Sequence, residues 1–257
     1  MRVIILAAGQ GTRLGSVTDH QPKCLVEIGG VSILAHQLSN CERAGVDDVV
    51  VVTGSFADDV DAAIERWRQE RPRRTQVASL YNPFFDVANN MISLWAARGV
   101  MDADFITING DNVFDWRILE RLIAWNGAEI TVTVDDKNGY DEDDMKIVLE
   151  EGRITAMNKN MPLDVANGES IGIMKFSGEG RKLIYSELET MARLETYATE
   201  WYVQAIERIA QSNGHVDVMP VGDLRWAEVD FPADLEHVQT HCLDLLTATD
   251  VGGLVHC

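Results

Sequence analysis

Apolar residues gather in short β-branched runs that alternate with amphipathic stretches through the first half of the chain. Runs that predict strands lie at residues 3–7, 48–52, 75–81 and 104–109. The apolar spacing of a helix recurs at residues 33–44, 58–71 and 91–98. Strands that alternate with helices indicate a mostly parallel sheet covered by helices on both faces. The pattern therefore predicts an α/β fold.

The second half of the chain follows a less regular pattern. Strands are expected at residues 129–134, 146–149, 154–157 and 170–176, and helices at residues 178–191 and 201–212. The acidic stretch 135–144 is expected to be a solvated loop over the open edge of the sheet. Because no repeat, low-complexity tract or linker interrupts the sequence, we expect a single domain over residues 1–257.

Charge and composition narrow the classes of partner. The formal net charge is -19, with 22 Lys and Arg against 41 Asp and Glu, which argues against nucleic acid. No apolar run reaches the roughly 20 residues that cross a bilayer, so no membrane partner is expected. The apolar start runs directly into Gly9, as a first strand does and a signal peptide does not. Cys24, Cys41, Cys242 and Cys257 show no paired spacing, and we expect free thiols in a cytoplasmic protein.

A glycine-rich segment follows the first predicted strand. Residues 6–14 are Leu-Ala-Ala-Gly-Gln-Gly-Thr-Arg-Leu, and Pro22-Lys23 follows. Small residues at the carboxyl end of a strand let backbone amides approach phosphate oxygens, and Arg13 and Lys23 add positive charge there. The dinucleotide fingerprint is excluded because Leu14 stands at its third glycine, and the P-loop because Gly-Lys-Ser/Thr is absent. The segment predicts a phosphate-binding loop.

Carboxylates in two other segments are candidate metal ligands. Asp111 comes just after a predicted buried strand, and Glu228 and Asp230 share one strand face by the two-residue period. Carboxylate oxygens suit Mg²⁺, a hard cation. Solvated turns or a helix cap are the alternatives, since Asp230 precedes Pro232 of an expected final helix.

The glycine segment and Pro22-Lys23 together resemble the signature of the sugar-nucleotidyltransferase superfamily, and the resemblance extends over most of the chain. It implies a Rossmann-like fold of the nucleotide-diphospho-sugar transferase type, with a mixed, mostly parallel sheet. The nucleotide-binding half is then expected at about residues 1–125 and the acceptor-binding half at about 126–250. The resemblance implies nucleotide contacts from Leu6, Ala7, Ala8, Gly9, Gly11, Thr12, Arg13, Lys23, Gly110 and Asp111. It gives Arg13 and Lys23 catalytic roles on the phosphates, and it makes Asp111, Asp230 and Glu228 the Mg²⁺ ligands.

Further segments resemble particular branches of that superfamily. Tyr81-Asn82-Pro83 and residues 88–94 resemble bacterial phosphocholine cytidylyltransferases, which implies Asn82 and Asn90 near the base and ribose. Asn suits the donor and acceptor edge of cytosine, although either residue also suits a turn or a helix cap. Residues 143–147 and 158–160 resemble inositol 1-phosphate cytidylyltransferases, which implies that Lys146 and Lys159 contact the acceptor phosphate. The alternative for Lys159 is a surface strand.

The acceptor is left open by the sequence. Glu200, Trp201 and Tyr202 offer carboxylate and aromatic groups to a quaternary ammonium, and the alternative for Trp201 and Tyr202 is core packing. We expect a Mg²⁺-dependent cytidylyltransferase that joins CTP to a small phosphorylated alcohol, such as phosphocholine, and releases pyrophosphate. The alternatives are a sugar-1-phosphate or cyclitol-phosphate nucleotidyltransferase using CTP, UTP, dTTP or GTP, and an inactive nucleotide-binding subunit. No oligomeric state is predicted.

Overall fold

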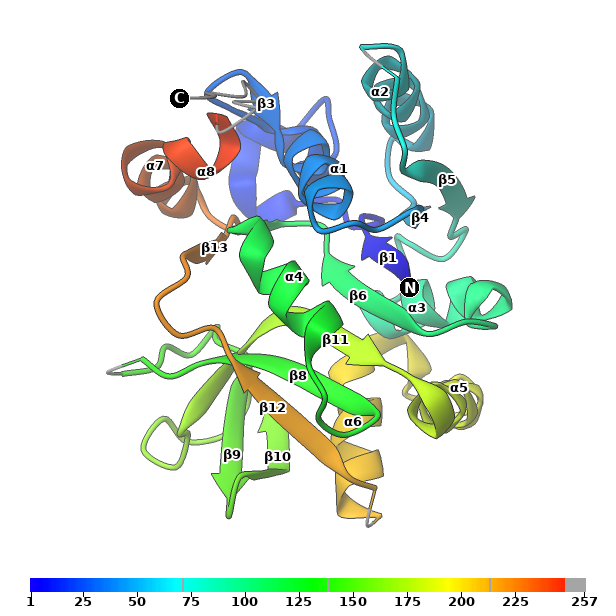
Figure 1. Cartoon of the computed structure of the whole chain (residues 1–257), viewed down its shortest axis with the longest axis vertical. Helices are drawn as coiled ribbons and strands as arrows, with labels where there is room; N and C mark the ends of the chain where they lie inside the picture. The colour runs from blue at the N-terminus through cyan, green and yellow to red at the C-terminus, as the bar shows by residue number, and fades with distance from the viewer. Residues whose placement is uncertain (71, 138, 213, 248–257) are drawn as a thin grey trace, which may run out of the picture.

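A nine-stranded sheet runs through both halves of the chain (Figure 1). The structure is a computed structural model that describes residues 1–70, 72–137, 139–212 and 214–247. The first-half strands are β1 (Arg2–Leu6), β4 (Asp48–Thr53), β5 (Gln76–Tyr81) and β6 (Phe105–Asn109). The second-half strands are β8 (Ile130–Asp135), β9 (Lys146–Glu150), β10 (Arg153–Asn158), β11 (Gly168–Phe176) and β12 (Val216–Pro220).

The sheet is mixed, as predicted. Its order is β10-β9-β11-β6-β1-β4-β5, and β8 and β12 continue from β11. Strands β6, β1, β4 and β5 are parallel to one another, whereas β11 is antiparallel to β6, β8 and β9. Strand β12 is parallel to β8. Every strand predicted from the sequence is present, and its ends differ by at most two residues.

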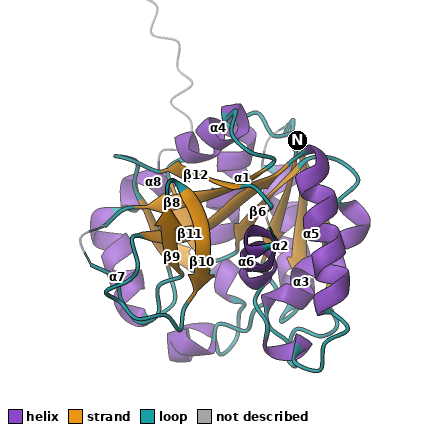
Figure 2. Ribbon diagram, turned by 90° about the horizontal axis from the view of Figure 1, so that it is seen from below, coloured by secondary structure: helices purple, strands orange, loops and turns teal. Residues whose placement is uncertain are grey.

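Helices cover both faces of the sheet (Figure 2). They are α1 (Ile33–Arg43), α2 (Ala57–Gln69), α3 (Asn90–Ala96), α4 (Trp116–Ala124), α5 (Gly178–Met191), α6 (Tyr202–Gln211), α7 (Pro232–His241) and α8 (Leu243–Thr247). Side chains of β1 alternate between the faces, so Val3 and Ile5 pack with α1, α2 and α4. Ile4 and Leu6 pack with α3, α5 and α6. The predicted α/β architecture is therefore confirmed.

Several elements were not predicted. They are α4, β12, α8, the two-stranded pair β2 (Glu27–Ile28) and β3 (Val31–Ser32), and β7 (Asn112–Phe114). Strand β7 pairs with β13 (Trp226–Glu228), the strand expected at Glu228, which ends before Asp230. Two 3-10 helices, at Thr12–Thr18 and Lys23–Leu25, follow the glycines and were not predicted either. The Asp115 side chain caps α4 by accepting from the Arg117 N–H, and α4 buries Ile118, Leu119 and Leu122.

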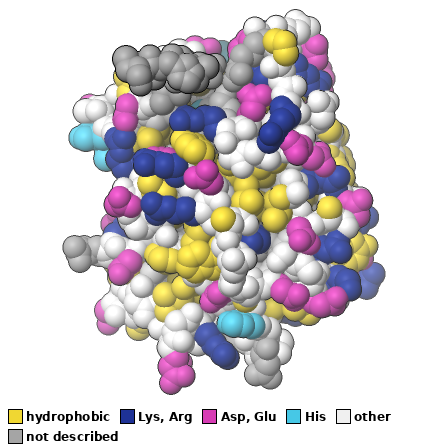
Figure 3. All heavy atoms as spheres, in the orientation of Figure 1, with side chains coloured by type: hydrophobic (Ala, Val, Ile, Leu, Met, Phe, Trp, Pro, Cys, Tyr) yellow, Lys and Arg dark blue, Asp and Glu magenta, His cyan; other side chains and the backbone are white. Residues whose placement is uncertain are grey.

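The charged side chains of the surface and the cysteines can be compared with the sequence over the described residues. On the face shown in Figure 3, Lys and Arg side chains are interspersed with Asp and Glu. Cys24, Cys41 and Cys242 are free and buried, and Cys257 lies outside the described residues. Among the helices that the structure describes, none is both long and apolar enough to span a bilayer.

Candidate active site

The glycine-rich loop begins where β1 ends and lies against the turn after β6. The Ala7 N–H donates to Val52 O at 2.9 Å, and the Gly110 N–H donates to Leu6 O at 2.9 Å. Gly11 has a φ of +69°, and a Cβ there would lie 2.9 Å from Lys23 Cβ. A Cβ on Gly110 would lie 2.6 Å from Leu6 O. Only glycine lets these backbone segments approach so closely.

A pocket of about 500 Å³ opens at this edge of the sheet. The predicted site residues that line it are Leu6, Ala8, Gly9, Gly11, Thr12, Arg13, Asn90, Gly110, Asp111, Lys159, Trp201, Tyr202 and Glu228. Lys23 and Asp230 contact this lining through Asp111 and Arg13. The two predicted halves of the site therefore face one cavity at the carboxyl ends of β1 and β6, where open α/β sheets bind ligands.

Three carboxylates meet at one side of the pocket. Asp111, Glu228 and Asp230 each place an oxygen within 4.8 Å of the other two. Asp111 follows β6, and Glu228 ends β13, where it pairs with Asn112 of β7. The Val229 N–H donates to Asp111 O at 3.1 Å, which ties the two segments together. The small β7–β13 pair therefore brings residues from distant parts of the sequence into one cluster.

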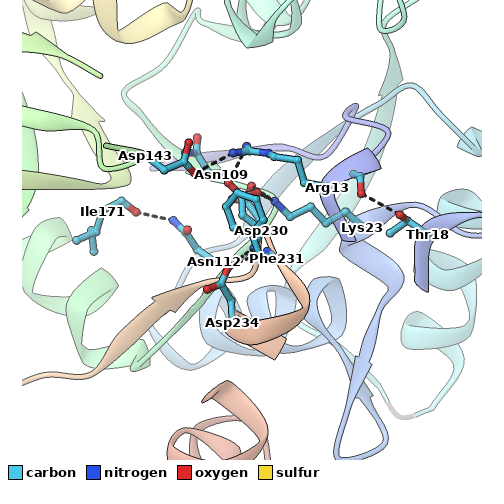
Figure 4. Close-up of polar contacts among 12 residues, drawn as sticks. Arg13, Thr18, Lys23, Asn109, Asn112, Asp143, Ile171, Asp230, Phe231 and Asp234 are labelled. Carbon is cyan, nitrogen blue, oxygen red and sulfur yellow. Dashed lines mark hydrogen bonds and ion pairs between the residues drawn. The ribbon is translucent and has the colours of Figure 1, made fainter. Parts of the chain in front are cut away.

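Two cations neutralise part of this cluster (Figure 4). The Lys23 Nζ lies 2.7 Å from Asp111 Oδ2 and also contacts Asp230 Oδ1. The Arg13 Nη2 lies 2.7 Å from Asp230 Oδ2. Burial alone lowers the pKa of Lys23, but the charges of Asp111 and Asp230 outweigh it and raise the pKa overall. Lys23 therefore remains a cation between the two carboxylates.

The acidic cluster fits a divalent cation such as Mg²⁺. Asp111 Oδ1 is buried and has no hydrogen-bond partner among the described residues. A buried carboxylate oxygen without a partner is costly unless a ligand satisfies it. Burial, together with the charges of Asp111 and Asp230, raises the pKa of Glu228 to about 8. Carboxylates that repel one another in this way gain from a cation that binds all three.

The segment that carries Asp230 is held by the side chain of Asp234. The sequence had offered Asp230 itself as the cap of the final helix. Asp234 Oδ2 accepts the N–H groups of Asp230 and Phe231 at 2.9 and 2.7 Å. Asp234 thus satisfies the start of α7, and Asp230 is not the cap of that helix. The side chain of Asp230 is free to face Lys23 and Arg13.

The pocket lining also brings a cation close to an aromatic ring, and this cation pairs with a carboxylate. Lys159 Nζ lies 3.3 Å from Asp143 Oδ1 and 5.5 Å from the centre of the Trp201 ring. Tyr202 is fully buried, and its hydroxyl donates to Asn109 Oδ1 at 3.3 Å. The Tyr202 N–H donates to Asn90 Oδ1 at 3.2 Å. The core-packing alternative thus describes Tyr202, which nevertheless forms part of the pocket floor.

Lys146 does not contact the pocket, contrary to the sequence prediction. It is fully buried, and its Nζ donates to the carbonyl oxygens of Asp141, Glu142 and Asp144 at 3.0, 3.0 and 3.3 Å. All its ammonium donors are used by one turn of the chain. An acceptor phosphate cannot reach this ammonium without unfolding that turn.

The lining of the pocket also leaves out Asn82, Glu200 and Ala7. Asn82 is fully buried, where its side chain donates to Ser93 Oγ at 3.1 Å and accepts from the Phe84 N–H at 3.0 Å. This is the turn role that was its alternative. Glu200 is half-buried beside Trp201 but is not part of the lining, and neither is Ala7, which is buried under the loop.

Sequence reasoning missed part of the pocket floor. Asn109, Asn112 and the backbone of Ser170, Ile171 and Gly172 line it. The register of β11 shifts between Ser170 and Met174, and Gly172 has a φ of +72°. Asn112 Nδ2 donates to Ile171 O at 2.5 Å across this irregularity. A glycine inside an apolar strand pattern was the one signal of such a bulge.

Similar proteins include enzymes with cytidylyltransferase names. A CMP-5'-(3-aminopropyl)phosphonate synthase of Streptomyces rubellomurinus is 28% identical over 91% of this chain, which spans only 37% of that protein. A CTP:phosphoglutamine cytidylyltransferase of Campylobacter jejuni is 24% identical over 92% of this chain and 98% of its own length. The solved inositol-1-phosphate CTP transferase of T. maritima shares the fold, with a TM-score of 0.81 and 21% identity over 100% of this chain and 98% of that one.

The family is shown by a match that covers most of the chain. Residues 3–217 match the MobA-like NTP transferase domain. The match includes the glycine loop, Lys23, Asp111 and Lys159, and it ends before Glu228 and Asp230. The resemblance to the nucleotidyltransferase superfamily is therefore confirmed, and the chain belongs to the family of the MobA-like NTP transferase domain and is a nucleotidyltransferase.

Proposed function

We propose that this chain is a Mg²⁺-dependent cytidylyltransferase that joins CTP to a small phosphorylated alcohol or phosphonate and releases pyrophosphate. The observation that carries the proposal is the meeting of Lys23 with Asp111 and Asp230 at the mouth of a glycine-lined pocket. A glycine loop suits a triphosphate, and a triad of carboxylates suits its metal. The cytidylyltransferase names of the similar proteins support CTP as the donor.

The reaction is a direct displacement at phosphorus. An anionic oxygen of the acceptor attacks the α-phosphorus of CTP, and the bond to the bridging oxygen of pyrophosphate breaks. The acceptor oxygen needs no general base because it is already ionised near neutral pH. Positioning and charge neutralisation therefore supply most of the rate enhancement.

Each charged residue has a role in this scheme. Asp111, Glu228 and Asp230 would hold Mg²⁺, which supplies positive charge to the phosphates. Lys23 would shift from these carboxylates to the α-phosphate, where negative charge grows. Arg13, whose guanidinium is half exposed to the pocket, would bind the departing pyrophosphate.

The acceptor is proposed to bind across the second half of the chain. Lys159 would contact its phosphate or phosphonate, and the Trp201 ring, which already faces an ammonium, would cover its organic part. In this division, residues of about 1–125 bind the nucleotide and residues of about 126–250 the acceptor. The sheet that continues through both halves supports treating them as one domain.

The pH dependence of metal binding follows from Glu228. Its raised pKa, about 8 in the metal-free chain, means that its carboxyl group holds a proton at pH 7. A carboxylate must lose that proton to bind a metal, so Mg²⁺ affinity should rise with pH up to about 8 and level off above it. We expect a gain of up to about tenfold per pH unit below 8 by calorimetry without nucleotide. In Glu228→Gln the affinity should be weaker and nearly independent of pH, and a pH-dependent affinity in that variant would contradict the assignment.

Donor choice can be tested by thermal stability. The nucleotide that binds the folded chain most tightly raises its melting temperature most. With equal concentrations of CTP, UTP, dTTP and GTP and excess Mg²⁺, the largest increase is expected for CTP. A larger increase with UTP, dTTP or GTP would move the assignment to a sugar-phosphate nucleotidyltransferase. Stabilisation by CTP without pyrophosphate release for any acceptor would support the inactive-subunit alternative.

A further inference from the structure

One carboxylate of the acidic loop bridges two cations that line the pocket. Asp143 Oδ2 lies 2.8 Å from Arg13 Nη1 (Figure 4). Asp143 Oδ1 lies 3.3 Å from Lys159 Nζ. Arg13 belongs to the glycine loop, and Lys159 follows β10. Both cations line the pocket, whereas Asp143 is neither a predicted metal ligand nor part of the glycine loop. Within this turn Asp143 and Asp144 are half-buried, whereas Asp141 and Glu142 are exposed.

The turn that presents Asp143 is held from below. The buried Lys146 donates to the carbonyl oxygens of Asp141, Glu142 and Asp144, which surround Asp143 in the chain. Its ammonium is enclosed, so these bonds are not exchanged with water. Because Lys146 holds three carbonyl groups of this turn, it fixes the direction in which the Asp143 side chain points.

A second anchor holds the far side of the same turn. Asp144 Oδ2 lies 2.8 Å from Lys137 Nζ and accepts the Asp141 N–H at 2.7 Å. Lys137 also pairs with Glu169 of β11, whose side chain is buried. Asp144 therefore pairs with Lys137, and Asp143 pairs with the two cations of the pocket lining, although the two residues are adjacent.

The electrostatics of the pocket depend on this carboxylate. Among the described residues that line the pocket, Arg13 and Lys159 are the cations, and Asp143 pairs with both. The two oxygens of Asp143 occupy N–H donors of Arg13 and Lys159. Two oxygens of a phosphate would otherwise accept hydrogen bonds from these donors. An anion that enters this place must displace Asp143 or share its donors.

We propose that Asp143, positioned by Lys146, is an internal counter-ion of the two phosphate-binding cations Arg13 and Lys159, and that it selects against small free anions. The inference rests on the proposed function for its biological meaning. Inorganic phosphate alone gains only the contacts with Arg13 and Lys159 that Asp143 already makes. A nucleoside triphosphate with its metal, or an acceptor with an organic group against Trp201, brings further contacts that offset the displacement.

The test compares two variants that each remove one negative charge from the same turn. Asp143→Asn removes the counter-ion, and Glu142→Gln is the matched control because the Glu142 side chain is exposed. Binding of inorganic phosphate is measured by calorimetry at low ionic strength without Mg²⁺. Because exposed ion pairs are weak, Asp143→Asn should tighten phosphate binding about three- to tenfold, and Glu142→Gln less than about twofold. The gain should shrink in high salt.

Lys146→Met provides a second test through the positioning residue. The turn should loosen, and phosphate binding should tighten in the same direction as in Asp143→Asn. In the double variant, the two effects should not add, because both act through one carboxylate. Full additivity would mean that Lys146 acts on the pocket by some other route and would contradict its positioning role. Should Lys146→Met fail to fold, Asp143→Asn alone decides the inference.

The outcomes separate this inference from the proposed function. Unchanged phosphate binding in Asp143→Asn, or an equal gain in Glu142→Gln, would overturn the counter-ion role even if CTP turnover is normal. Absence of CTP turnover in the wild-type chain would overturn the proposed function, whereas the expected tightening of phosphate binding would still support the role of Asp143.

Discussion

Replacing Lys23 with alanine is expected to reduce turnover with CTP at least about a hundredfold, the scale of losing one charge-stabilising donor. The Lys23 ammonium lies between Asp111 and Asp230, next to the loop that would hold the α-phosphate. Its loss removes positive charge where negative charge grows in the transition state. The decisive measurement is single-turnover pyrophosphate release at saturating CTP and Mg²⁺, which separates the chemical step from binding.

The same variant should also lose stability in a way that Mg²⁺ partly restores. Without Lys23, Asp111 loses its cationic partner among the described ion pairs and Asp230 keeps only Arg13, which costs about 3 kcal/mol. A divalent cation would replace the missing charge. Lys182→Ala is the matched control because Lys182 is exposed and pairs only with its helix neighbour Glu179 among the described ion pairs. Near-normal single turnover in Lys23→Ala would remove Lys23 from the mechanism.

Asp230→Asn is expected to lower turnover about 10²- to 10³-fold, because it removes a metal ligand and a partner of both cations. Asp230 is buried, and its oxygens face Lys23 and Arg13. Higher Mg²⁺ concentrations should recover part of the activity, because the remaining carboxylates of Asp111 and Glu228 still bind the metal weakly. The dependence of rate on Mg²⁺ concentration measures this shift.

Glu236→Gln is the control for Asp230→Asn. It neutralises one exposed carboxylate on α7, the helix that begins just after Asp230. Its Mg²⁺ dependence should match that of the unchanged chain. If Asp230→Asn also keeps that dependence, the metal is held elsewhere and the carboxylate cluster has another role.

The fold of the first half could be predicted because its strands and helices are set by local periodicity. Residues 48–52 are apolar at nearly every position, and residues 33–44 carry a helical stripe, so each segment indicates its own conformation. Helix α4 was not predicted although its apolar stripe of Ile118, Leu119 and Leu122 is equally local. Strand β12 is short, and it becomes a strand by pairing with β8, which is distant in the sequence.

The positions of some residues of the candidate site could likewise be predicted from the sequence, and those of others could not. The glycine loop and Asp111 follow strands whose carboxyl ends meet by topology, so their proximity could be predicted. The burial of Lys146 could not be predicted, because a charged residue in a strand pattern gives no sign that a turn will enclose its ammonium group. Asp143 and Asp144 are identical neighbours in the sequence. Only the tertiary position of Lys137 and Lys146 decides which of them faces the pocket.

The most direct test of the account is pyrophosphate release with CTP and Mg²⁺ across phosphocholine, 2-aminoethylphosphonate, inositol 1-phosphate and glucose 1-phosphate. The proposed function predicts turnover with one of the first three acceptors. It also predicts that this turnover is lost when Mg²⁺ is chelated and when Lys23 is replaced. Turnover with glucose 1-phosphate alone, or release of no pyrophosphate with any of the four acceptors, would contradict the proposed function.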